Sequence, residues 1–165
     1  MRNRSHDIAL LLLRVATGLV FIPHGWSKVF GAGGPAAFAA DLPAYGIPSI
    51  LGYVTAYAEL FGAVLLVAGL LTRIDAFLLA CTMGAAAFVV KLPEALYEVP
   101  PGWGKLLAGI RGMELELVLL ATSLALVLTG AGRYSLDALL GIDARVRALL
   151  GKKKAAAEAA ALSKA

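Results

Sequence analysis

Ionisable residues interrupt the apolar stretches of this chain, where they could bind a polar ligand or move protons. His24 and Lys28 lie four residues apart in the segment PHGWSK, and Glu59 lies in the middle of the next apolar stretch. The spacing of four residues places His24 and Lys28 on one face of a helix. Charged groups at membrane depth normally pair with one another or line a pathway. An imidazole can also donate to a carbonyl and exchange a proton near neutral pH.

The elements that must position these residues are apolar helices. Of the 165 residues, 60% are hydrophobic and only 16% are charged, and the mean hydropathy is +0.82. A helix of about 20 mainly apolar residues crosses the hydrocarbon core of a bilayer. The composition therefore predicts an all-α fold, a membrane-spanning four-helix bundle in a single domain over residues 1–141. The predicted spans are residues 8–30, 50–71, 74–90 and 113–129.

The distribution of positive charge predicts the orientation of the spans. The net charge is +4, and most cations fall before the first span, between the second and third spans, or in the tail. Four antiparallel spans bring these regions to one side, which is the cytoplasmic side by the positive-inside rule. We therefore expect a multi-pass protein of a bacterial cytoplasmic (inner) membrane with both termini in the cytoplasm. The cations are explained by topology and membrane lipid, so we expect no nucleic acid as a partner.

The connections between the spans carry helix signals of their own. Pro35 favours a short helix over residues 36–42, and the tight connection over residues 71–75 predicts an antiparallel hairpin. Residues 93–112, which contain prolines and glycines, read as an irregular outer loop. Ser135 is a predicted N-cap for an amphipathic helix over residues 136–150 on the cytoplasmic leaflet. Residues 142–165 are therefore predicted to form a cytoplasmic region of amphipathic helix and Lys/Ala-rich tail.

The predicted topology brings ionisable groups from all four spans to the outer half of the bundle. His24 and Glu59 differ in depth by only about 5 Å at the helical rise of 1.5 Å per residue, so His24 or Lys28 can meet Glu59. The candidate ligand-binding residues are His24, Lys28, Glu59, Lys91 and Glu114, with Arg111 and Glu116 nearby. The cluster either fixes helix packing or binds a polar head group such as a quinone carbonyl or a small anion. Arg14 is predicted to lie in the inner half, outside this cluster, where it pairs or extends to the inner leaflet.

The sequence lacks the residue patterns that several kinds of chemistry require. The two histidines, His6 and His24, fall at opposite sides of the predicted membrane, so no metal site is expected. Cys81 has no second cysteine with which to form a dithiol. The sequence contains neither a dinucleotide-binding nor a phosphate-binding glycine motif. We therefore expect no intrinsic cofactor. A quinone is the one redox ligand that we consider for this chain.

Three segments resemble the DoxX family of small bacterial membrane proteins. They are LLLRVATGLVFIPHGWSKVFG, AELFGAVLLVAGLLTR and GAGRYSLDALL, and the resemblance extends from Leu11 to Leu140. It implies a four-helix membrane bundle and redox work linked to quinone. Relatives in this family are named for a thiosulfate:quinone oxidoreductase, and some members associate with oxidative-stress enzymes. The resemblance assigns no catalytic residue to this chain.

Three hypotheses on function follow. The chain is either an integral membrane subunit of a quinone-linked redox complex, with quinone at the outer cluster, or a structural or assembly subunit of a larger membrane complex. Both hypotheses imply other protein subunits as partners, and only the first would make the chain part of an oxidoreductase. A small-solute transporter is disfavoured, because the sequence has no inverted repeat or broken span. The sequence leaves the substrate, the partner proteins and the oligomeric state open.

Overall fold

In the computed structural model, the described part of the chain, residues 4–97, 103–142 and 145, is helical and contains no strand. The elements in chain order are α1 (Arg4–Phe30), α2 (Gly34–Asp41), the 3-10 helix η1 (Leu42–Tyr45), α3 (Ile50–Ala68), α4 (Thr72–Ala85), the π-helical turn η2 (Ala86–Lys91), α5 (Leu92–Tyr97), α6 (Trp103–Gly112), α7 (Glu114–Thr129) and α8 (Leu136–Leu139). The predicted all-α class is confirmed.

Within the described residues, three helical stretches are long and apolar enough to cross a membrane. They are α1, α3 and the continuous stretch Thr72–Tyr97, which consists of α4, η2 and α5. The helix α7, with 16 residues, matches the bounds of the fourth predicted span but is shorter than these three. Pro23 lies inside α1 without ending it, as prolines often do in membrane helices.

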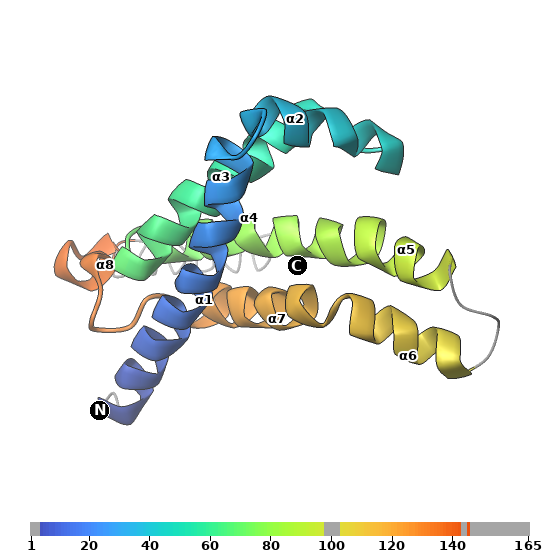
Figure 1. The fold of residues 1–165 in the computed structure, drawn as a ribbon. Coiled ribbons are helices and arrows are strands. Elements are labelled where there is room, and N and C mark those ends of the chain that lie inside the picture. The colour runs from blue at the N-terminus through green and yellow to red at the C-terminus, as the bar shows by residue number, and fades with distance from the viewer. Residues whose placement is uncertain (1–3, 98–102, 143–144, 146–165) are drawn as a thin grey trace, which may run out of the picture.

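The long helices form two packed pairs that diverge from a common crossing (Figure 1). The helix α1 packs mainly against α3, and α4 packs mainly against α7. We call the end of the molecule where α1 begins and α8 lies the α8 end, and the opposite end of α1 and α3 the α2 end. In Figure 1 the α1–α3 pair leads to α2. The stretches α4–α5 and α6–α7 run side by side in a different direction from the common crossing.

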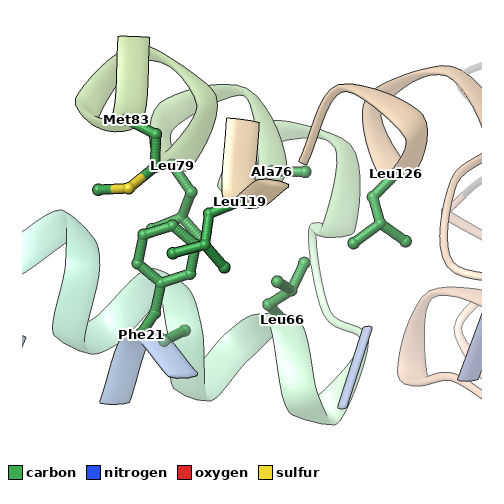
Figure 2. Packing of buried hydrophobic residues seen from close by; sticks show 8 residues of the cluster. Phe21, Leu66, Ala76, Leu79, Met83, Leu119 and Leu126 are labelled. Atoms are coloured by element: carbon green, nitrogen blue, oxygen red, sulfur yellow. The ribbon is translucent and has the colours of Figure 1, made fainter. Parts of the chain in front are cut away.

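A single hydrophobic cluster joins the two pairs where they cross. Figure 2 shows Phe21 of α1 and Leu66 of α3 packed against side chains of α4 and α7. Phe21 and Leu66 have no exposed surface. The close approach of α1 to α3 depends on glycine, because a Cβ at Gly25 would lie 2.4 Å from the backbone nitrogen of Leu60. Small residues permit such contact between helix backbones.

Several local predictions are confirmed. The short helix after Pro35 is α2, and α3 and α4 form a hairpin through a turn in which Gly69 adopts φ 71°. Ser135 caps α8, since its hydroxyl accepts a hydrogen bond from the N–H of Ala138. Each of these features depends on residues close together in the sequence, which is why local patterns predicted them.

The predicted irregular loop over residues 93–112 is wrong. Within that range the structure forms α5 and α6, which pack against each other. A Cβ at Gly109 would lie 3.2 Å from the side chain of Leu92, and one at Gly112 would lie 3.0 Å from Ala95. These glycines therefore serve helix packing rather than chain reversal. Pro93 lies inside the continuous stretch Thr72–Tyr97, two residues after the π-helical turn, and it removes a backbone N–H there without ending the helix.

The predicted helix over residues 136–150 is also wrong in its first half. The helix α8 ends at Leu139, and Gly141 adopts φ 68°, a conformation that stops a helix. Asp137, expected on the polar outer face, is buried, whereas Leu136 and Leu139 are exposed. Most of the remaining predicted helix, together with the Lys/Ala-rich tail, lies outside the described residues.

Candidate functional site

A partly buried ion pair joins α1 to α3 near the α2 end. The Nζ of Lys28 lies 2.5 Å from Oε2 of Glu59 and donates a hydrogen bond to it. Glu59 is 1% exposed and the Lys28 side chain is 22% exposed, so the ammonium can contact a second group while it holds the carboxylate. Lys28 lies three residues after Gly25, the position at which the two helix backbones meet. The close helix crossing therefore brings the two side chains together.

The ion pair lies beside a cavity of about 430 Å³, which we call the α2-end cavity. Its walls come from α1, through Lys28, and from α2, η1, α3, α4 and η2, and they are mostly apolar. Phe38 of α2 covers Lys28, whose Nζ lies 4.7 Å from the centre of the ring. Lys91 also lines the cavity, and among the described residues no hydrogen bond or ion pair of its ammonium is found. The cavity thus combines apolar walls with two cationic hydrogen-bond donors.

A hydrogen bond links the two helix pairs beside this cavity. The hydroxyl of Tyr45, on η1, donates to Oε1 of Glu94, on α5, over 2.7 Å. This hydrogen bond, followed by the negative charge of Glu94, raises the pKa of Tyr45 above its ordinary value of 10.0. Tyr45 lines the cavity and is exposed. The bond therefore connects the segment that covers the cavity to the end of the opposite helix pair.

The predicted site residues separate into two groups. Lys28, Glu59 and Lys91 line the α2-end cavity. His24 is exposed and does not line it, and among the described residues the partner of Glu59 is Lys28. The contact of His24 with Glu59 that we expected is therefore not made. His24 precedes Gly25 by one residue, which turns its side chain about 100° around the helix from the contact with α3.

Glu114 is the second predicted site residue outside the cavity. It is exposed in the first turn of α7, and α7 contributes no residue to the walls. Arg111 on α6 is exposed as well.

The sequence analysis missed the part of the cavity that comes from the connection between α1 and α3. Phe38, Asp41 and Tyr45 lie there, and Thr55 and Thr82 add hydroxyl groups from α3 and α4. A signal was present for α2, since its helix was predicted from Pro35. The fold of this connection over Lys28 depends on tertiary contacts, which the local pattern does not contain.

A second buried polar cluster, which we call the α8-end clamp, consists of Arg14, Arg73 and Asp137 with the backbone groups that they bind. Arg14 is 1% exposed. It donates through NH1 to the carbonyl of Ala131 and through NH2 to the carbonyl of Tyr134, both over 2.6 Å. Arg14 is thus paired, which is one of the two outcomes predicted for it, and its partners are backbone carbonyls of the loop before α8.

The other two clamp residues cap helices. Asp137 accepts hydrogen bonds from the N–H groups of Leu71 and Thr72, over 2.7 and 2.9 Å, and so caps the start of α4. Arg73 donates to the carbonyls of Val127 and Leu128 near the end of α7. Each interaction places a charge where the helix dipole favours it. The clamp therefore joins the interior of α1, the start of α4, the end of α7 and the segment that leads into α8.

The fold and the site together define a class of protein, a small helical membrane protein with a polar pair beside an apolar cavity. Residues 9–92 match the DoxX family, so the chain belongs to that family. The matched range includes Lys28, Glu59 and Lys91. These three are the predicted site residues that line the α2-end cavity. No solved structure matches the chain.

Three relatives match most of the chain. A Bacillus subtilis protein named "Putative oxidoreductase CatD" is 40% identical over 82% of this chain and 89% of its own length. An uncharacterised protein of Haemophilus influenzae is 33% identical over 78% of this chain and 87% of its own length. The Escherichia coli inner membrane protein YqjF is 26% identical over 84% of this chain and 96% of its own length. These names associate the family with membranes and, in one relative, with oxidoreduction.

Proposed function

We propose that this chain is an integral membrane subunit of a redox complex and that it contacts quinone in the α2-end cavity. The observation that carries the proposal is the partly buried Lys28–Glu59 pair beside a mostly apolar cavity of about 430 Å³. Cavities of about 300–1,000 Å³ with apolar walls and a few polar groups are typical of small-molecule sites. A quinone has matching chemistry, an apolar ring with two carbonyl acceptors. The name of the B. subtilis relative is consistent with a redox role.

The residues of the cavity would have distinct roles towards such a ligand. Lys28 uses one of its three donors on Glu59, so another can donate to a carbonyl oxygen. Lys91 offers a second cationic donor. A quinone that accepts two electrons also takes up two protons, and the Lys28–Glu59 pair would hold exchangeable protons beside the ring. Phe38 and the aliphatic walls would exclude water from it.

The electrons would come from another subunit of the complex. The proposal therefore assigns quinone binding and proton exchange to this chain, and it assigns electron transfer to a partner protein with a redox centre. The alternative is that the chain is a structural or assembly subunit. In that case the Lys28–Glu59 pair would only fix the crossing of α1 and α3, and loss of the pair would change complex assembly without a loss of bound quinone.

For the membrane topology we propose a four-helix bundle in which α6 and α7 together form the fourth crossing. This assignment is supported by the position of α6–α7 beside the long stretch α4–α5 in Figure 1. The cations before and at the start of α1, at the start of α4 and in the sequence after α7 favour cytoplasmic termini. On this assignment the α8 end faces the cytoplasm, the tail includes the predicted amphipathic helix, and the α2-end cavity lies in the outer half. A reporter fused after Ala165 should remain inside the cell, and an exported reporter would overturn this orientation.

The test of quinone binding uses the full chain, purified in mild detergent and reconstituted with a long-chain quinone. Bound quinone is extracted and quantified for the wild type, for Lys28→Met and for Glu59→Gln. We expect occupancy to fall about tenfold or more in Lys28→Met, since the loss of a charge-assisted hydrogen bond corresponds to about 1.5–3 kcal/mol. Glu59→Gln should retain binding better but should slow quinone-dependent turnover in the assembled complex.

The matched control is His24→Ala, which removes an ionisable group one turn before Lys28 on the same helix but outside the cavity. This variant should bind quinone like the wild type. Equal occupancy in Lys28→Met, His24→Ala and the wild type would contradict a quinone site in this cavity. If Lys28→Met folds and keeps its quinone but no longer joins its complex, the structural alternative is correct.

A further inference from the structure

A second cavity lies at the α8 end, on the far side of the core from the quinone site proposed above. It has a volume of about 540 Å³, and its lining residues are Arg4, Asp7, Arg133 and Tyr134. Two of these residues are arginines, and neither guanidinium has a hydrogen-bond partner recorded in the described part of the chain. With the buried Asp7 counted, the formal charge of the lining is +1.

The loop that carries Arg133 and Tyr134 is held rigidly. Arg14 donates to the carbonyls on either side of Arg133, those of Ala131 and Tyr134. Oδ1 of Asp7 accepts from the N–H of Arg133 itself over 3.1 Å, and the hydroxyl of Ser135 donates to the carbonyl of Gly132. A buried arginine and a buried aspartate thus fix the backbone of an exposed arginine. Preorganisation of this kind lowers the entropy lost when a ligand is bound.

Exposed apolar side chains lie close in the sequence to the residues that line this cavity. Ile8 on α1 is exposed just after the cavity residues Arg4 and Asp7. Leu136 and Leu139 of α8 are exposed, although they follow directly on the loop that carries Arg133. In a membrane protein these side chains face acyl chains, while the two arginines lie at the end of the apolar stretch. The ring of Tyr134, half exposed between them, is suited to the interface.

We propose that this cavity binds a phosphate group. The proposed ligand is the phosphodiester of an anionic phospholipid in the membrane leaflet at the α8 end. The planar guanidinium group suits phosphate oxygens, to which it can donate two parallel hydrogen bonds. The formal charge of +1 matches the single negative charge of a phosphodiester. Asp7 lies on the loop side of the cavity and disfavours ligands of higher charge. The site does not depend on quinone binding at the α2 end.

The experiment compares lipids on the full chain in detergent. Phosphatidylglycerol, phosphatidylcholine and inorganic phosphate are added at equal concentration, and bound molecules are counted by native mass spectrometry together with the melting temperature. The variant is Arg4→Gln with Arg133→Gln. The control is Arg145→Gln, which removes a described, exposed arginine that does not line the cavity. One basic residue near an anionic surface contributes about a fivefold gain in affinity, so the double variant should lose about 30-fold.

Each outcome decides a part of the proposal. Preferential binding of phosphatidylglycerol that is lost in the double variant and kept in Arg145→Gln supports the lipid site. Equal binding and stabilisation by inorganic phosphate supports the phosphate site but assigns it to a soluble anion. An equal loss in Arg145→Gln would show that only overall charge matters and would overturn the proposal. If the double variant does not fold, the wild type still decides, because equal binding of the two lipids overturns the proposal.

Discussion

The two ends of this molecule bury charge in different ways. At the α2 end, Lys28 and Glu59 pair side chain to side chain, beside a cavity into which Lys91 brings a further cation. At the α8 end, Arg14 and Asp137 bind backbone groups, and each spans two of them. The first arrangement leaves donors for a ligand. The second uses its donors and acceptors on the fold itself.

This difference indicates which buried charges serve function and which serve the scaffold. A carbonyl or N–H at a helix end or in a loop needs a partner when water is absent. The clamp residues supply such partners, so their removal should damage folding first. In the Lys28–Glu59 pair the two side chains bind each other and, among the described residues, no backbone group. Removal of the pair should therefore affect ligand binding more than folding. The four predictions below test this contrast, from the largest expected effect on stability to the smallest.

The largest effect is expected for Arg14→Met. The change leaves the carbonyls of Ala131 and Tyr134 without their charged donor in a buried position. Two hydrogen bonds of this kind correspond to a loss of about 3–6 kcal/mol of stability. Detergent-solubilised protein should therefore be mostly aggregated in size-exclusion chromatography. Arg111→Met, which removes an exposed arginine, is the control and should behave like the wild type. A monodisperse Arg14→Met protein would show that the clamp is dispensable.

The next effect is expected for Asp137→Asn. Asp137 accepts from two backbone N–H groups through its two oxygens, and an asparagine side chain has only one oxygen. We expect a loss of about 1–2 kcal/mol, comparable to the loss of a helix cap, measured as a lower melting temperature in detergent. The control, Asp41→Asn, alters an exposed aspartate at the end of α2. Equal melting temperatures in the two variants would contradict the capping role.

A smaller effect on stability is expected at the α2 end, and it should be non-additive. Lys28→Met leaves the Glu59 carboxylate buried without its cation, and Glu59→Gln leaves the ammonium without its anion. In the double variant neither charge remains. Interhelical polar pairs in membranes contribute about 0.6–2 kcal/mol, so the double change should destabilise less than the sum of the single changes. Melting curves of the four proteins measure this coupling, and strictly additive values would exclude it.

The smallest effect is expected for Tyr45→Phe, which removes the hydrogen bond to Glu94 between the two helix pairs. Melting temperature should change little, because the bond is exposed, but bound ligand should exchange faster. The raised pKa of Tyr45 in the folded state means that the bond contributes stability below the ordinary value of about 10. This contribution is lost as pH rises through the folded pKa. The difference between wild type and variant should therefore be constant to about pH 9 and should decrease above about pH 10. A difference that grows at high pH would contradict this assignment.

The sequence predicted the features that depend on local pattern. The apolar stretches, the short helix at Pro35, the α3–α4 hairpin and the cap at Ser135 are all fixed by residues within a few positions of one another. The hairpin connection lies at residues 69–71, slightly before the predicted residues 71–75, since α4 begins at Thr72. The prediction failed where glycine and proline serve packing rather than chain reversal. The described residues of the range 93–112 lie in α5 and α6, and Gly109 and Gly112 let the two helices approach closely, which composition alone cannot distinguish from a loop.

The sequence by itself determined that Glu59 needs a partner, because a carboxylate in an apolar stretch is too unfavourable to leave alone. It narrowed that partner to His24 or Lys28 through their spacing. Only the tertiary structure decided for Lys28, because the backbone contact at Gly25 sets the rotation of α1 against α3 and turns His24 away. The partners of Arg14 were similarly beyond reach, since they are carbonyl groups more than 100 residues away. Backbone carbonyls occur at every residue, so no sequence pattern marks the two that a buried arginine will bind.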